Sequence, residues 1–140
     1  MLQYGTIIET VNQRFPEIHG HDECVELISC DEDLKKLAYV YFPAFWKLLE
    51  VTFLADEPNE DLLSRIFSFM EEMAMCEDQD VVNLMQIEML EPLFGLEYVH
   101  YQRMVKKYLK PKTLLLHQAQ FPYFKLPSAP NISKGWKWRK

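Results

Sequence analysis

The sequence contains few of the residues on which covalent or metal frameworks depend. Its three cysteines, Cys24, Cys30 and Cys76, are odd in number and form no C-x-x-C pair, so neither a disulfide framework nor a thiolate zinc site is indicated. No run of apolar residues reaches the roughly 18 that span a bilayer, and the start MLQYGTIIET does not resemble a secretory signal. We therefore expect a soluble cytoplasmic protein with no membrane partner, whose cysteines are reduced and mostly buried.

Basic residues are scarce in the first two thirds of the chain. Residues 1–95 hold 20 Asp and Glu against five Lys and Arg, a net charge of −15, whereas residues 96–140 hold one acid against ten bases, a net of +9. Such an asymmetry indicates a charged partner, or two surfaces of one fold that attract each other.

Apolar residues recur at helical spacing along most of the chain. Residues 4–15 carry one apolar stripe that ends at Pro16, and further helices are expected near 60–76, 81–92, 96–109 and 112–121. Asn59 or Asp56 is expected to cap the first of these, and Asp78 or Asp80 the second. Around Pro43 the sequence predicts one helix near 32–41, capped by Asp31, and another beginning at the proline, with a single kinked helix as the alternative.

No convincing strand pattern interrupts these segments. With 140 residues and 49% apolar side chains, the chain can form one packed domain. We predict an all-α fold, a compact bundle of about six or seven helices stacked as HEAT-like hairpins over residues 1–121. Residues 122–140 are expected to form an extended basic tail that packs on the domain or on a partner.

The acidic residues exceed what helix capping requires, because capping uses about one acid per helix. The excess predicts a negative surface suited to a basic protein partner. Aromatic anchors such as Trp46 or Tyr41 could contribute to this surface if they are exposed. The predicted partner-binding residues are Glu57, Glu60, Asp61, Glu71, Glu72, Glu77, Asp78 and Asp80.

Catalytic and metal-binding patterns are weak. Glu97 and His100 form one E-x-x-H on a helix, but a di-iron bundle needs a second copy and two more glutamates. His19 and His21 flank a glycine without matching ligands elsewhere in the sequence. We therefore predict a non-enzymatic protein with no catalytic residues, metal or cofactor, and expect neither a small-molecule ligand nor nucleic acid as its main partner.

The end of the sequence, KGWKWRK, offers an alternative. It combines two tryptophans with basic side chains, the residue types that stack on bases and pair with phosphates. Alternatively, the tryptophans pack on the helices and the basic groups face the acidic half of the chain. The alternative binding residues are Trp136, Lys137, Trp138 and Arg139.

Residues 62–93, LLSRIFSFMEEMAMCEDQDVVNLMQIEMLEPL, form a methionine-rich helical hairpin with an acidic turn. A methionine stripe at this spacing is more often core than an adaptable binding surface. The segment resembles small helical immunity proteins of bacterial contact-dependent inhibition and related polymorphic toxin systems. The resemblance implies a bacterial inhibitor that binds and neutralises a cognate toxin domain, such as a basic nuclease, and it transfers no functional residue.

Overall fold

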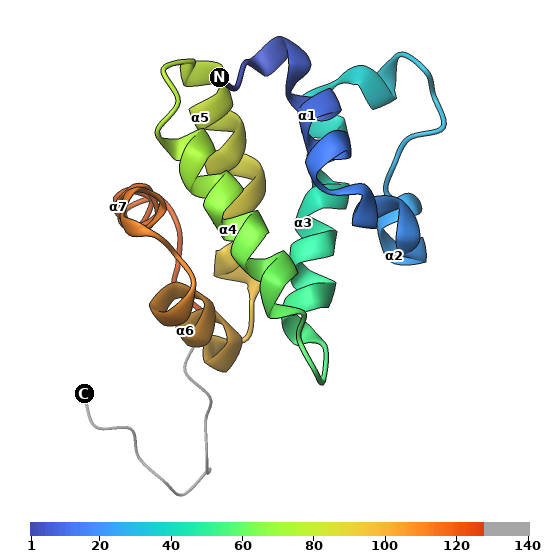
Figure 1. Ribbon diagram of the computed structural model, residues 1–140. Coiled ribbons are helices and arrows are strands. Elements are labelled where there is room, and N and C mark those ends of the chain that lie inside the picture. The colour runs from blue at the N-terminus through green and yellow to red at the C-terminus, as the bar shows by residue number, and fades with distance from the viewer. Residues whose placement is uncertain (128–140) are drawn as a thin grey trace, which may run out of the picture.

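The computed structural model describes residues 1–127, and within them the chain is all-α, as predicted (Figure 1). Short 3₁₀ turns cover Tyr4–Thr6, Pro16–Gly20, Leu34–Lys36 and Glu91–Gly95, and a π-helical turn covers Gln86–Leu90. No helix in this part of the chain is both long and apolar enough to cross a membrane. The α-helices are α1 (Ile7–Arg14), α2 (Asp22–Val25), α3 (Ala38–Leu54), α4 (Glu60–Ala74), α5 (Gln79–Met85), α6 (Tyr98–Lys107) and α7 (Pro111–Ala119).

Helices α4 and α5 form the hairpin that the sequence predicts, side by side in the middle of Figure 1. Asn59 caps α4, since its side-chain oxygen accepts a hydrogen bond from the backbone N–H of Leu62 at 3.0 Å. Asp78 caps α5 and also accepts a hydrogen bond from the backbone N–H of Tyr4 at 2.9 Å. The acidic turn therefore fixes both the start of α5 and the N-terminal segment of the chain.

The core is centred on an aromatic cluster between α1, α3 and α4. The ring of Phe45 lies 4.9 Å from that of Phe15, 5.6 Å from that of Phe42 and 5.8 Å from that of Phe69, measured between centroids. All four side chains are at most 2% exposed. Because Phe45 touches the other three, it joins elements that lie far apart in the sequence.

The region around Pro43 differs from the prediction of two helices. Helix α3 runs without a break through Pro43, and Asp31 caps the turn that precedes Leu34–Lys36 by accepting hydrogen bonds from the backbone N–H groups of Asp33 and Leu34. A proline inside a helix costs about 3 kcal/mol. The residues on both sides, Phe42 and Ala44, are completely buried, so the packing of α3 outweighs this cost.

The methionines and cysteines of the hairpin region occupy mixed environments. Four methionines predicted to be core are fully buried, at positions 70, 73, 85 and 89, whereas Met75 is 69% exposed. Among the cysteines only Cys24 is buried, so the expectation of mostly buried cysteines is wrong: Cys30 is exposed and Cys76 is half-buried. The Sγ of Cys76 donates a hydrogen bond to the carbonyl of Leu2.

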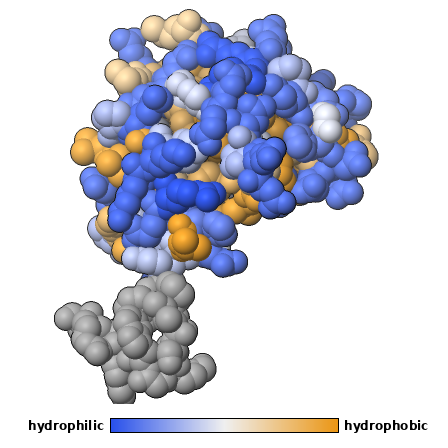
Figure 2. All heavy atoms as spheres, turned by 60° about the horizontal axis from the view of Figure 1, so that its bottom comes forward, coloured by the Kyte–Doolittle hydropathy of each residue, from blue (hydrophilic) through white to orange (hydrophobic). Residues whose placement is uncertain are grey.

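Figure 2 turns the lower end of Figure 1 toward the viewer, the end at which α3 gives way to α4. This face is mostly hydrophilic, and its apolar side chains form separate small patches. Singly exposed apolar residues of this kind are ordinary on a protein surface.

Candidate functional site

A groove lies between the end of the α4–α5 hairpin and α7. It has a volume of about 860 Å³. Met75 on one wall and Leu115 on the other are 69% and 60% exposed. The groove therefore presents mobile thioether and aliphatic side chains that can repack around a partner. Its apolar lining consists of Ala74, Met75, Cys76, Val82, Pro111, Leu115 and Leu116.

Glu71 lines this groove and holds α7 in place. One of its carboxylate oxygens accepts a hydrogen bond from the backbone N–H of Lys112 at 2.8 Å, and the other from that of Thr113 at 2.9 Å. Both N–H groups belong to the first turn of α7 and have no partner within the helix. Glu71 is thus a helix cap supplied by a residue on another helix, and the helix dipole favours its negative charge.

Four more of the predicted binding acids have partners within the fold. Glu72 forms a salt bridge of 2.7 Å with Arg14, and Asp61 forms one of 3.1 Å with Arg65. Glu60 accepts a hydrogen bond of 2.8 Å from the hydroxyl of Tyr108, and Asp78 caps α5. These side chains contribute to the negative surface but also stabilise the fold.

The other three predicted acids are Glu57, Glu77 and Asp80. All three are exposed, and within residues 1–127 their carboxylates make no hydrogen bond or salt bridge. Glu77 lies in the turn just before Asp78, and Asp80 lies in the first turn of α5, close to the groove-lining residues Cys76 and Gln79. This pair is therefore the part of the predicted surface that is both unengaged and next to the groove.

Glu71 and Glu72 allow a direct comparison between a structural and a surface carboxylate. We expect Glu71→Ala to lower the free energy of unfolding by about 1–2 kcal/mol, because the N–H groups of Lys112 and Thr113 in the first turn of α7 lose their acceptor, in one exposed and one half-buried hydrogen bond. Glu72→Ala removes an exposed ion pair and should cost no more than about 1 kcal/mol. Urea denaturation of both variants provides the measurement, and equal losses would contradict the capping role of Glu71.

A second, smaller hollow lies at the C-terminal end of α7. Its volume is about 390 Å³, and Glu91, Ile87 and Tyr123 are among the residues that line it. Burial raises the pKa of Glu91. Burial also raises the pKa of the neighbouring Glu88, and the negative charge of Glu91 raises it further. The side-chain amide of Gln120 donates a hydrogen bond of 3.1 Å to the carbonyl of Gln86, which connects α7 to the π-helical turn between the two hollows.

The remaining candidates of the sequence analysis do not join this site. Tyr41 is only 3% exposed, so it is not a surface anchor, and Trp46 is half-buried against the core. Glu97 is exposed, and the ring of His100 packs against Phe53 at 6.3 Å between centroids. No group of three or more potential metal ligands occurs among residues 1–127. The tail candidates Trp136, Lys137, Trp138 and Arg139 lie outside the described residues.

Sequence reasoning missed the apolar groove. Met75 and Leu115 lie 40 positions apart in the chain and face each other only because Glu71 fixes α7 beside α4 and α5. The one local signal for the groove was Met75 at the end of α4. This apolar residue falls outside the buried stripe of the helix and is exposed.

The fold and this surface together define a small all-α domain with a largely apolar groove, which Glu71 and Lys112 also line and which lies next to the acidic turn at Glu77 and Asp80. The model of a protein family described as a domain of unknown function, DUF7674, matches residues 8–121, and the chain belongs to this family. The matched region begins in α1 and ends just after α7, so it includes the groove and every helix that lines it.

Comparison with curated proteins gives a partial match. Over 90 residues the chain is 37% identical to a calcium/calmodulin-dependent protein kinase kinase from Caenorhabditis elegans. The match covers 59% of this chain but only 15% of that longer protein. No solved structure matches the chain significantly.

Proposed function

We propose that this chain is a non-enzymatic protein-binding domain that acts as an immunity protein, neutralising a basic toxin domain by binding it. The observation that carries the proposal is the combination of an apolar groove with unengaged carboxylates at its margin. Protein interfaces commonly have an apolar centre and a polar rim, and the groove beside α7 has this arrangement. Met75 and Leu115 supply the centre, and Glu77 and Asp80 supply the charged margin.

The charge of the domain supports a basic partner. Residues 1–95, which form α1 to α5, carry a net charge of −15. A long-range negative potential of this kind accelerates association with a positively charged protein and repels the nucleic-acid backbone. A nuclease toxin is basic because it must bind phosphates, so it would be attracted to the surface that excludes its substrate.

The partial match to the kinase kinase supports a binding module in a more general way. The similar segment makes up 15% of that protein, so the sequence pattern also occurs as a small part of a longer chain. A domain has its own core and can in principle fold alone, so a segment of this size can supply a binding surface while other parts of a longer chain carry the chemistry. The kinase activity of that protein is not transferred to this chain.

The proposal is tested by capturing a partner at about 0.15 M salt, a physiological ionic strength, and then expressing that partner alone and with this chain. An immunity function requires that the partner alone stops cell growth and that co-expression restores it. A captured protein whose expression leaves growth unchanged would overturn the immunity function. Recovery of RNA or DNA without a protein would instead favour the predicted alternative, binding through Trp136, Lys137, Trp138 and Arg139.

The acidic turn can be tested by charge reversal at the residues that the fold does not use. We expect the double substitution Glu77→Lys and Asp80→Lys to slow association with the captured partner by about tenfold at low salt, because it reverses the local potential that attracts the partner. The difference should shrink as salt increases, because salt screens exposed charges. Stopped-flow association rates measured over a salt series provide the test.

A matched control is available on the other side of the molecule. Glu26 and Asp33 are exposed, and they lie in the segment around and after α2, away from α5 and α7 in Figure 1. Their substitution by lysine changes the net charge by the same amount. If this control slowed association as much as the Glu77 and Asp80 variant, then total charge rather than the acidic turn would steer binding.

A further inference from the structure

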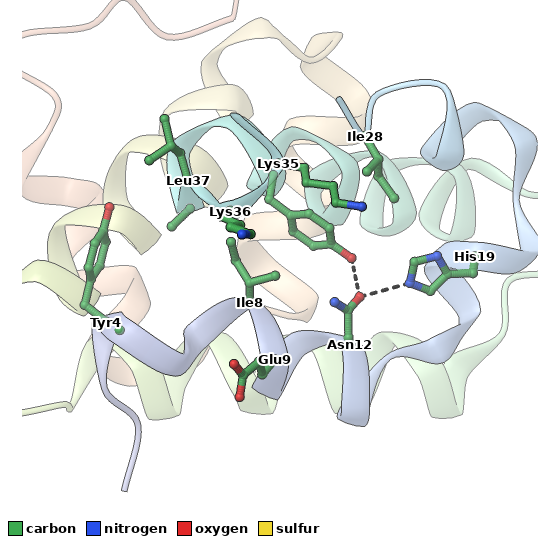
Figure 3. Close-up of a pocket in the computed structure, with 12 residues that line it drawn as sticks. Tyr4, Ile8, Glu9, Asn12, His19, Ile28, Lys35, Lys36 and Leu37 are labelled. Carbon is green, nitrogen blue, oxygen red and sulfur yellow. Dashed lines mark hydrogen bonds between the residues drawn. The ribbon is translucent and has the colours of Figure 1, made fainter. Parts of the chain in front are cut away.

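A third cavity, which shares no lining residue with the groove, lies between α1 and the segment that leads into α3. It has a volume of about 510 Å³, within the range of sites that bind small molecules. One wall comes from α1 and the Pro16–Gly20 turn, and the other from residues 28–38 and the first turns of α3 (Figure 3). Two polar groups, one from each wall, meet at Asn12: the hydroxyl of Tyr41 and the ring of His19.

Two hydrogen bonds fix the orientation of the Asn12 side chain. The hydroxyl of Tyr41 donates to Asn12 Oδ1, and Nε2 of His19 donates to the same oxygen at 3.0 Å (Figure 3). Tyr41 is 3% exposed, and burial raises its pKa, so the phenol remains a proton donor at neutral pH. Because both donors hold the oxygen, the amide nitrogen of Asn12 must point the other way, toward Ile8 and Lys36 in Figure 3.

Lys36 supplies an uncompensated positive charge beside this amide. Of the five basic residues in residues 1–95, four form salt bridges with carboxylates: Arg14, Lys35, Lys47 and Arg65. Lys36 forms none with any residue in the described part of the chain. In a region with a net charge of −15, an exposed lysine that lines a cavity without a salt bridge is a marked exception; Glu9 lines the same cavity but forms no ion pair with Lys36.

Apart from Glu9 and from Lys35, which pairs with Glu32, the rest of the cavity is largely apolar. Ile8, Ile28 and Leu37 line it, and Leu37 is 52% exposed at its edge. A ligand that satisfies both kinds of surface needs a charged head and an apolar body. A single unpaired lysine matches a single negative charge, and the two N–H groups of the Asn12 amide can both be donated to a carboxylate.

We propose that this cavity binds a small amphipathic monocarboxylate, with its head at Lys36 and the Asn12 amide and its apolar body against Ile8, Ile28 and Leu37. This site is independent of the protein-binding groove. It also departs from the sequence prediction that a small-molecule ligand is not expected, because the residues that form it come from three separate segments and no motif marks them.

Sodium octanoate is a suitable probe, and octan-1-ol and inorganic phosphate are matched controls that lack the charge or the apolar body. For a ligand of about ten non-hydrogen atoms we expect a Kd on the order of 0.1–1 mM. In ¹H–¹⁵N NMR spectra, octanoate should shift the side-chain amide signals of Asn12 and the backbone signals of Ile28 and Leu37 along one saturable curve. Octan-1-ol should bind at least about tenfold more weakly, the difference of about 1.4 kcal/mol that one charge-assisted hydrogen bond supplies.

Lys36→Met tests the charge while keeping the aliphatic stem. This variant should weaken octanoate binding by about tenfold or more, whereas Lys106→Met, which removes an exposed lysine of α6, should leave the Kd unchanged. The proposal is overturned if octanoate shows no saturable binding to the unmodified protein, if octan-1-ol binds equally well, or if the shifted signals lie away from Asn12. Unchanged binding to Lys36→Met would overturn it as well.

Discussion

Replacing Phe45 by alanine is expected to destabilise the domain by about 3–5 kcal/mol, the largest effect of any substitution considered for this protein. Phe45 is completely buried and contacts Phe15, Phe42 and Phe69, so its removal leaves a cavity where α1, α3 and α4 meet. Edge-to-face aromatic contacts add to the loss of burial. Urea denaturation followed by far-UV circular dichroism measures the effect.

Leu54→Ala is the matched control, because Leu54 is the last residue of the same helix and is 43% exposed. It should cost less than about 1 kcal/mol. A typical domain is stable by only about 5–15 kcal/mol, so the Phe45→Ala variant could be too unstable to purify. Phe45→Leu, which keeps most of the volume, should then give a smaller measurable loss. Equal stability losses for Phe45→Leu and Leu54→Ala would contradict a core centred on Phe45.

The parts of the fold that local patterns control were predictable from the sequence. Apolar stripes predict helices α1 and α4. Pro16 predicts where α1 ends, and the cap at Asn59 predicts where α4 begins. Around Pro43 the rule that proline ends a helix led to the wrong prediction of two helices, whereas α3 is continuous. The energy that keeps α3 continuous comes from residues such as Phe42 and Ala44 packing against distant segments, and spacing along the chain does not reveal such contacts.

For the candidate site, the sequence composition predicted only that the surface is negatively charged. The excess of acids indicated a negative surface, but the role of each acid depends on a partner far away in the sequence. Glu71 and Glu72 are neighbours, yet Glu71 caps α7 through Thr113 and Glu72 pairs with Arg14. Similarly, the amide of Asn12 is oriented by Tyr41, which lies 29 positions further along the chain. Sequence alone therefore could not separate structural acids from those free to bind.

The second large effect is expected at His117, where α6 and α7 meet. His117 is fully buried, its Nε2 accepts a hydrogen bond of 2.9 Å from the hydroxyl of Tyr101, and its Nδ1 donates one of 3.2 Å to Gln120. The ring also packs at 4.7 Å from that of Phe94, measured between centroids. We expect His117→Ala to cost about 2–3 kcal/mol at pH 7.5, because it creates a cavity and leaves the Tyr101 hydroxyl without its acceptor.

This cost should shrink in acid. Burial lowers the pKa of His117 from its ordinary value of 6.5, although the hydrogen bond to Gln120 acts in the opposite direction. As the pH falls below 6.5, the unfolded chain therefore takes up a proton at this histidine before the folded protein does, and stability is lost. At pH 5.5 the loss reaches at most about 1.4 kcal/mol, and the alanine variant lacks it.

The difference in unfolding free energy between the unmodified protein and His117→Ala should thus be smaller at pH 5.5 than at pH 7.5, by at most about 1.4 kcal/mol. Leu115→Ala, an exposed substitution on the same helix, adds or removes no titratable group and should retain the full pH dependence of the unmodified protein. A cost of His117→Ala that stays constant between the two pH values would show that this histidine can take up a proton in place. In that case the contact between α6 and α7 would tolerate a charge, and its stability would rest on the aromatic rings around His117 rather than on the Tyr101 hydroxyl.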